Sequence, residues 1–111
     1  MIVGIGCDIV QIDRFKGQQN QWKERILTER EKELYSSFQQ NRQRTFLAGR
    51  FAAKEALIKA LDIPVSMKSL EILPDSKGKP AIHIGGYEIH LSISHEKEYA
   101  IGYALVEREY E

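Results

Sequence analysis

The sequence has 111 residues, of which 42% are hydrophobic and 29% are charged, and its formal charge at neutral pH is zero. This composition argues against a disordered chain and against a membrane protein, since no apolar run approaches the roughly 20 residues that a spanning helix needs. The single cysteine, Cys7, excludes an internal disulfide, and the first residues lack the basic start of a signal peptide. We therefore expect one small domain over residues 1–111, located in the cytoplasm and without a membrane partner.

One strand is predicted at the start of the chain. The segment IVGIGC at residues 2–7 is rich in β-branched residues and predicts a strand with Asp8 at its end. Apolar residues at helical spacing predict a short helix over residues 9–15, and the polar stretch at residues 17–20 predicts a turn. Asp8 is therefore expected at the point where the strand ends and a helix begins.

The next segments are predicted to be helical. Residues 22–27 have helical spacing, and Thr28 with Glu31 forms a T-x-x-E capping box for a second helix that extends to about residue 38. A long helix is predicted over residues 41–61, before the Asp-Ile-Pro sequence that ends it.

The last part of the chain changes to short extended runs. Turn residues surround Gly78 and Pro80, and two more glycines precede the alternating run EIHLSIS. The predicted strands are SLEILP (69–74), AIHI (81–84), EIHLSIS (88–94) and YAIGYALVE (99–107). The fold class predicted is α+β, with helices packed on an antiparallel sheet in a single small domain.

The long helix contains RFAAKEALIKAL at residues 50–61, which leaves no broad polar face and yet carries four charges. Buried charges are costly unless they are paired, metal-bound or ligand-bound. Glu55 could meet Asp8 in space, and Mg²⁺ takes one or two carboxylates together with water and phosphate oxygens. The alternatives are a helix cap for Asp8 and an ion pair from Glu55 to Lys59, one turn away. Spacing alone favours these alternatives over a metal.

Arg50 and Lys54 are like charges one helical turn apart, which mildly destabilises a bare helix. A phosphate-rich ligand would turn this repulsion into attraction through charge-assisted hydrogen bonds. The alternative is that the long side chains extend to solvent. Both interpretations remain open from the residues alone.

Ser92, Ser94 and His95 form the most nucleophile-like set in the chain. A serine and a histidine adjacent in a strand point to opposite faces, and no G-x-S-x-G elbow exists, so a Ser/His hydrolase is rejected. His95 could donate to a phosphate or carry a proton, and a structural role is an equal alternative. His83 and His90 have no ligand spacing and are interpreted as structural.

The zero net charge hides an uneven distribution. Residues 11–50 hold nine Lys or Arg against five Asp or Glu, a local charge of +4, whereas residues 51–111 hold seven against ten. The basic part could attract phosphates, nucleic acid or an acidic protein, although solvated helix faces would give the same count. A non-enzymatic module that binds RNA or an acidic protein is the competing hypothesis. It would need aromatic residues stacked on a basic sheet, and Tyr87, Tyr99 and Tyr103 are not interleaved with Arg or Lys.

Three motifs in order resemble one known family. The segment GIGCDIVQIDR (4–14) resembles the G-x-D-x-x-x-x-x-R opening of the phosphopantetheinyl transferases. The segment FLAGRFAAKEALIKAL (46–61) resembles their F-x-x-K-E-A-x-x-K-A signature, and LSISHEKEYAIGYALVE (91–107) resembles their S-x-S-H strand and its partner. The order, spacing and length are similar to the small, single-domain bacterial members of this family.

This resemblance implies a transferase of fatty acid biosynthesis that moves 4′-phosphopantetheine from coenzyme A to a serine of apo-acyl carrier protein. The by-product would be adenosine 3′,5′-bisphosphate. Asp8 and Glu55 would hold Mg²⁺, and Lys59 would stabilise charge on the phosphates. Glu55, directly or through a metal-bound water, would accept the proton of the serine hydroxyl. The catalytic residues implied are Asp8, Glu55, Lys59 and His95.

The resemblance also implies the surroundings of the site. The residues implied for coenzyme A are Arg50, Lys54, Gly78, Lys79, Pro80, Ser94 and His95, with Gly78-Lys79-Pro80 near the adenine. Lys54 has an alternative role of holding the site together. The carrier protein would meet Arg14, Trp22 and Arg25. Members of this type are homotrimers with sites between subunits, and no nucleic acid partner is expected.

Overall fold

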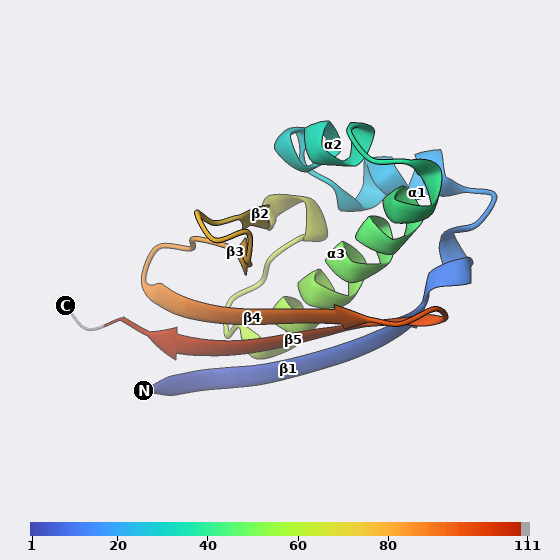
Figure 1. Cartoon of the computed structure of the whole chain (residues 1–111). Coiled ribbons are helices and arrows are strands. Elements are labelled where there is room, and N and C mark those ends of the chain that lie inside the picture. The colour runs from blue at the N-terminus through green and yellow to red at the C-terminus, as the bar shows by residue number, and fades with distance from the viewer. Residues whose placement is uncertain (110–111) are drawn as a thin grey trace.

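The structure is a computed structural model that describes residues 1–109 of the chain. It confirms an α+β domain with helices on one face of an antiparallel sheet (Figure 1). The elements in chain order are β1 (Ile2–Gln11), α1 (Gln19–Ile26), α2 (Glu29–Ser36), α3 (Gln40–Ala60), β2 (Leu73–Pro74), β3 (Pro80–Ala81), β4 (Tyr87–His95) and β5 (Tyr99–Arg108), with 3₁₀ turns at Ile12–Phe15 and Met67–Ser69.

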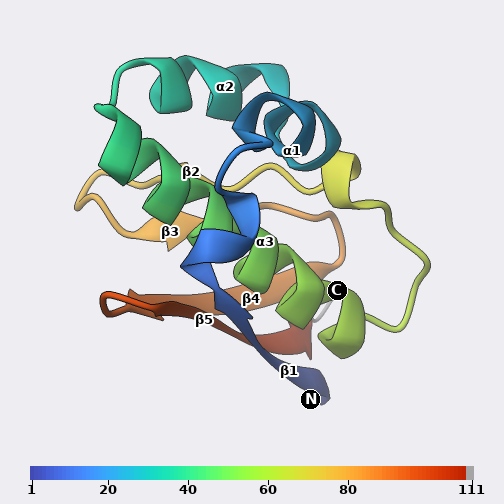
Figure 2. The same cartoon turned by 90° about the vertical axis from the view of Figure 1, so that its right-hand side faces the viewer.

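Two layers and a hairpin make up the fold. The main sheet has the order β1-β5-β4, and α3 crosses one of its faces, with α1 and α2 packed on the far side of α3 (Figures 1 and 2). The two-stranded hairpin β2–β3 lies beside α3 and next to β4. No helix or strand of residues 1–109 covers the other face of the main sheet in either view.

Close contact between α3 and the sheet depends on small residues. A Cβ atom on Gly6 would lie 1.8 Å from the carbonyl oxygen of Ala56, and one on Gly102 would lie 2.4 Å from the backbone of Ala52. The two backbones therefore pack directly on one another. This contact explains why the sequence places glycine in strands, where it otherwise weakens pairing.

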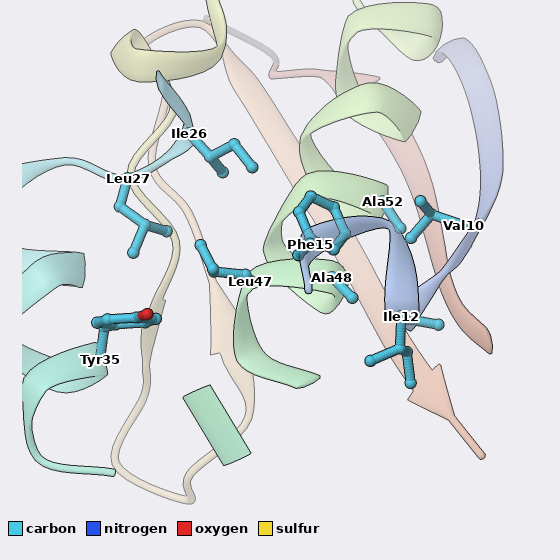
Figure 3. Close-up of a cluster of buried hydrophobic side chains, with 10 residues drawn as sticks. Val10, Ile12, Phe15, Ile26, Leu27, Tyr35, Leu47, Ala48 and Ala52 are labelled. Carbon is cyan, nitrogen blue, oxygen red and sulfur yellow. The ribbon is translucent and has the colours of Figure 1, made fainter. Parts of the chain in front are cut away.

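The core has two clusters along α3. The first joins the end of β1 to the helices and comprises Val10, Ile12, Phe15, Ile26, Leu27, Tyr35, Leu47, Ala48, Ala52 and Ala100 (Figure 3). The second lies under the C-terminal half of α3 and comprises Ala53, Ala56, Leu57, Ala60, Leu61, Leu70, Ile72, Tyr87, Ala104 and Val106. Helix α3 therefore contributes to both clusters, and its apolar character on all sides is explained.

The capping box is confirmed at the start of α2. The hydroxyl of Thr28 accepts from the backbone N–H of Glu31, and the carboxylate of Glu31 accepts from the backbone N–H of Thr28. None of the described helices is long and apolar enough to cross a membrane.

Four of the elements predicted from the sequence have wrong boundaries. Strand β1 continues to Gln11, so Asp8 lies inside the strand, opposite Gly102 of β5, and the predicted helix over residues 9–15 shrinks to a 3₁₀ turn. The runs at 69–74 and 81–84 form a ladder of only two residue pairs. The reason is the available partner: β5 pairs with β1 along its whole length, whereas the β2–β3 hairpin has only its own short arms.

Candidate active site

Asp8 and Lys59 meet on the β1 side of α3. The ammonium of Lys59 lies 3.4 Å from a carboxylate oxygen of Asp8 and donates to the carbonyl oxygen of Cys7 at 2.9 Å. The Asp8 side chain is 19% exposed and the Lys59 side chain 53% exposed, so the pair is open to solvent from one side. Residues 51 positions apart in the sequence thus form one charged site.

Glu55 belongs to the same side of α3. It stands one turn before Lys59 and is half-buried. Helix α3 runs antiparallel to β1, since Gly4 faces Ala60 and Gly6 faces Ala56. The part of β1 that follows Gly6 and contains Asp8 therefore runs toward the part of α3 that precedes Ala56 and contains Glu55.

This donor set fits Mg²⁺. Carboxylate oxygens are ligands that this ion prefers, and Asp8 and Glu55 are the residues that would hold it. The two alternative roles receive no support. Asp8 lies within β1 and caps no helix, and over residues 1–109 Lys59 pairs with Asp8 while Glu55 has no ion pair.

A second feature lies on the β4 side of α3. A cleft of about 550 Å³ opens between the N-terminal half of α3, the β2–β3 hairpin and the end of β4. Four of the residues that the resemblance implies for coenzyme A line it, namely Arg50, Gly78, Pro80 and His95. The structure thus brings together three segments that are far apart in the sequence.

Arg50 is held firmly at the wall of this cleft. Its Nε donates to the carbonyl oxygen of Ile72 at 3.2 Å, and its guanidinium lies 4.4 Å from the centre of the Phe46 ring. Burial lowers the pKa of Arg50, and the carboxylate of Glu31, 3.9 Å away, offsets only part of this effect. An arginine stays charged through such a shift, so the site presents a fixed cation to a ligand.

Sequence reasoning missed the residues that extend this wall. The guanidinium of Arg42 lies 4.2 Å from the Phe38 ring, and the rings of Phe38 and Phe46 are in edge contact at 5.3 Å. Both arginines and both phenylalanines line the cleft. Their spacing of four residues, with Arg and Phe alternating at 38, 42, 46 and 50, was the signal available in the sequence.

Lys54 does not line the cleft. Its side chain is 0% exposed, and its ammonium donates to the carboxylate of Glu31 and to the carbonyl oxygen of Ile26, both at 2.6 Å. Burial lowers the pKa of Lys54, and the hydrogen bond to Glu31 offsets only part of this effect. Contact with coenzyme A, which the resemblance implied, is therefore not available to Lys54 in this structure, and its alternative role of holding the site together fits.

Ser94 and Lys79 lie outside the cleft as well. Ile93 packs toward α3, and alternation along β4 turns the exposed Ser94 to the opposite face of the sheet. Lys79 is exposed in the β2–β3 hairpin, where its backbone N–H donates to the carboxylate of Asp75 at 3.0 Å. Both residues are adjacent in sequence to residues that line the cleft, but they do not line it themselves.

The two charged features lie on opposite sides of α3. At about 100° per residue, Lys59 is about 180° around the helix from Arg50, and Glu55 is about 140° from it. The sequence suggested one cluster of charges along the helix, and the structure separates them instead. A ligand bound in the cleft of one chain is therefore screened by α3 from the Asp8 and Lys59 pair of the same chain.

The residues implied for the carrier protein lie around one aromatic cluster. Phe15, Trp22 and Phe51 make edge contacts with one another at 5.1–5.9 Å. The guanidinium of Arg14 lies 5.7 Å from the Phe51 ring, and that of Arg25 lies 5.4 Å from the Trp22 ring. Phe51 precedes Glu55 by one helical turn, so this basic surface is on the Asp8 side of α3.

A further group of possible ligands lies on the uncovered face of the sheet. Side-chain atoms of Glu88, His90 and Glu107 lie within 4.8 Å of one another. His90 is 3.0 Å from Glu107 and 3.6 Å from Glu88. These are exposed ion-pair contacts between paired strands, in keeping with the structural role expected for His90.

The chain is similar to known proteins over nearly its whole length. The profile of the 4′-phosphopantetheinyl transferase superfamily matches residues 4–104. A holo-[acyl-carrier-protein] synthase of Geobacillus kaustophilus is 45% identical, with 97% of this chain and 91% of the relative covered. The enzyme of the same description from Bacillus subtilis is 42% identical, with 97% and 98% covered.

Solved structures agree with these sequence relatives. The holo-(acyl-carrier-protein) synthase of Bacillus anthracis, in complex with CoA (3′,5′-ADP), superposes with a TM-score of 0.91 at 40% identity, covering 98% of this chain and 99% of that one. The holo-[acyl-carrier-protein] synthase of Neisseria meningitidis gives a TM-score of 0.80 at 30% identity, with 97% and 100% covered.

Proposed function

The chain belongs to the 4′-phosphopantetheinyl transferase superfamily and is an enzyme of that kind, and on this premise we propose the reaction it performs. The enzyme transfers 4′-phosphopantetheine from coenzyme A to a serine of an apo-acyl carrier protein. The serine oxygen forms a bond to the phosphorus next to pantetheine, the pyrophosphate bond breaks, and adenosine 3′,5′-bisphosphate leaves. The observation that carries this proposal is the contact of Asp8 with Lys59, from two separate motifs, one helical turn from Glu55 on α3.

The residues of the charged site divide the tasks of metal binding, charge stabilisation and proton transfer. Mg²⁺ held by Asp8 and Glu55 would supply positive charge to the pyrophosphate of coenzyme A. Lys59 is free on its solvent side to contact phosphate oxygens and offset the charge that develops as the bond breaks. Glu55 accepts the proton of the incoming serine hydroxyl. The chain needs no nucleophile of its own because the carrier protein provides it.

The cleft binds the nucleotide end of coenzyme A. Arg50 and His95 face it with two nitrogen-bearing side chains, and Gly78 and Pro80 supply an apolar wall that suits an adenine. Binding in this cleft holds the pyrophosphate in place for reaction, which is most of what phosphoryl-type transfer requires of a protein. We place the enzyme in cytoplasmic fatty acid biosynthesis, as the resemblance to the small bacterial type implies.

Mass spectrometry of the carrier protein tests the reaction directly. The purified chain, coenzyme A, Mg²⁺ and apo-acyl carrier protein are incubated, and the carrier is expected to gain the mass of one phosphopantetheine group. A carrier whose acceptor serine is replaced by alanine is the control and should gain nothing. An unmodified wild-type carrier would contradict the proposed function.

We place the complete active site between two copies of the chain in a homotrimer. The uncovered face of the main sheet exposes large apolar side chains, with exposed fractions of 53% for Ile5, 59% for Ile9 and 44% for Tyr103. Apolar patches of this kind mark protein interfaces. Within one chain α3 separates the cleft from the Asp8 and Lys59 pair. In the trimer, a neighbouring copy would bring its own cleft to the Asp8 side of this chain.

Mixing two inactive variants tests this arrangement. In a one-to-one mixture of Arg50→Met and Glu55→Gln chains, dissociated and reassembled, about a quarter of the interfaces carry both native residues. We expect transfer to recover toward that fraction of the wild-type rate. A mixture as inactive as its two components would contradict a site shared between subunits.

The carrier protein binds to the basic surface around Phe51, and Arg14→Ala tests this contact. Loss of one surface charge facing an acidic partner is expected to raise the KM for the carrier about fivefold at low salt and to leave kcat unchanged. The effect should shrink as salt is added, because salt screens exposed charges. Arg30→Ala is the matched control, since Arg30 is an exposed basic residue of α2 that pairs with Glu71. An unchanged carrier KM in Arg14→Ala would refute the assignment.

A further inference from the structure

Glu31 is 0% exposed, and both of its carboxylate oxygens accept hydrogen bonds. Oε1 accepts from the backbone N–H of Thr28 at 2.8 Å and from the ammonium of Lys54 at 2.6 Å. Oε2 accepts from the backbone N–H of Ile72 at 2.9 Å and lies 3.9 Å from Nε of Arg50. One side chain therefore connects the start of α2, the middle of α3 and the segment that leads into β2.

A capping role does not account for this arrangement. The glutamate of a capping box needs only the N–H of the cap residue, and it can remain in solvent while it accepts that bond. Burial of the Glu31 and Lys54 charges carries a desolvation penalty, and such pairs often add no net stability over apolar side chains. What the buried carboxylate adds here is a fixed position for the groups around it.

The peptide groups of Ile72 connect Glu31 to the cleft. The N–H of Ile72 is bound by Glu31, and the carbonyl oxygen of the same residue accepts from Nε of Arg50 at 3.2 Å. With Nε engaged and the guanidinium stacked on Phe46, the plane of the Arg50 side chain is set from two directions. The two terminal nitrogens of Arg50 are then left for a ligand in the cleft that Arg50 lines.

We propose that Glu31 is a positioning residue for nucleotide binding, which acts by fixing Ile72 and through it the orientation of Arg50. This inference rests on the proposed function, since it assigns the ligand of the cleft as the phosphate-bearing nucleotide end of coenzyme A. Glu31 itself does not touch that ligand. Its effect is carried by two hydrogen bonds and one stacked ring.

Glu31→Gln tests the proposal because an amide cannot accept at all the positions that the carboxylate serves. Only one of its two terminal atoms accepts, so the N–H of Ile72 or the groups at Oε1 lose their partner. We expect the Kd for adenosine 3′,5′-bisphosphate, measured by calorimetry, and the KM for coenzyme A to rise about tenfold, which is the size of effect expected for the loss of one hydrogen bond to a charged group. The value of kcat at saturating coenzyme A should stay within about twofold, because Glu55 and Lys59 are untouched.

A double-mutant cycle separates positioning from a general loss of structure. If Glu31 acts through Arg50, the Glu31→Gln change should add almost nothing to the Kd of Arg50→Lys, which already lacks the native Nε bond. Thr28→Ala is the control for capping. It loses the side-chain cap of α2 and the hydrogen bond from the Thr28 hydroxyl to Glu71, but it keeps the contact of Glu31 with Ile72, and it should bind the nucleotide like wild type. Additive effects in the cycle, or equal weakening by Thr28→Ala, would overturn the proposal.

Two further measurements keep the outcomes distinct. If Glu31→Gln does not fold, Glu31→Asp keeps the charge beside Lys54 while its shorter side chain cannot span to Ile72, and the same rise in Kd is expected. An unchanged Kd in a folded variant would overturn the positioning role. Wild-type protein that transfers no phosphopantetheine and binds no nucleotide would instead contradict the proposed function itself.

Discussion

Glu55→Gln is expected to lower the rate of phosphopantetheine transfer by about a thousandfold or more and to leave the fold intact. The substitution keeps the size of the side chain but removes both its negative charge and its ability to accept a proton. Glu55 is half-buried on α3 and has no ion pair in the described part of the chain, so its charge is not needed for packing. The rate is measured by mass spectrometry of the carrier protein.

The matched control is Glu33→Gln, because Glu33 is an exposed glutamate on α2 and not on α3. It should transfer at the wild-type rate. Circular dichroism and thermal unfolding should show Glu55→Gln to be as folded as wild type, with a free energy of unfolding within about 0.5 kcal/mol. Near wild-type turnover in Glu55→Gln would exclude Glu55 both as a magnesium ligand and as the proton acceptor.

Gly6→Ala is expected to have the largest effect on stability. The added Cβ would lie 1.8 Å from the carbonyl oxygen and 2.7 Å from the carbonyl carbon of Ala56, which are backbone atoms in the C-terminal part of α3. No rotamer change can relieve this contact, so the helix must move away from β1. We expect a loss of about 3 kcal/mol in the free energy of unfolding, the upper end for an overpacked core.

Thermal unfolding measures this loss. Variant and wild type are compared at the same protein concentration, because the unfolding midpoint of an assembling protein depends on its concentration. A fall of roughly 15 °C corresponds to a loss of this size in a domain of about 100 residues. Gly85→Ala is the matched control, because a Cβ there meets nothing within 4 Å and the backbone is not in the left-handed region. Equal stability of the two variants would contradict direct backbone packing of α3 on β1.

The tertiary structure also explains why the charges of α3 resisted interpretation from the sequence. A pattern of residues along one helix tells which side chains share a face, and Glu55 with Lys59 were correctly placed one turn apart. It does not tell what each face meets. The β1 side gives Lys59 the partner Asp8, the cleft side gives Arg50 the stacked ring of Phe46, and the interior gives Lys54 the partner Glu31.

The boundaries that sequence reasoning missed have the same origin. Local signals were sufficient for the capping box of Thr28 and Glu31, because all its hydrogen bonds lie within four residues. They were insufficient for the length of β1, which is set by pairing with β5 about 90 residues later. The second role of Glu31, as a buried partner of Lys54 and Ile72, was invisible for this reason too.

The sequence by itself determined the fold class, the long helix, the family and the residue types of the chemistry, since these follow from local spacing and motif order. Only the tertiary structure decided that Asp8 lies within a strand beside Lys59, and that Arg50 belongs to a cleft on the other side of α3. It alone decided that Lys54 is a buried structural cation. The physical reason is that the energy of a charge depends on the groups around it in space, and those groups come from segments 20 to 50 residues away.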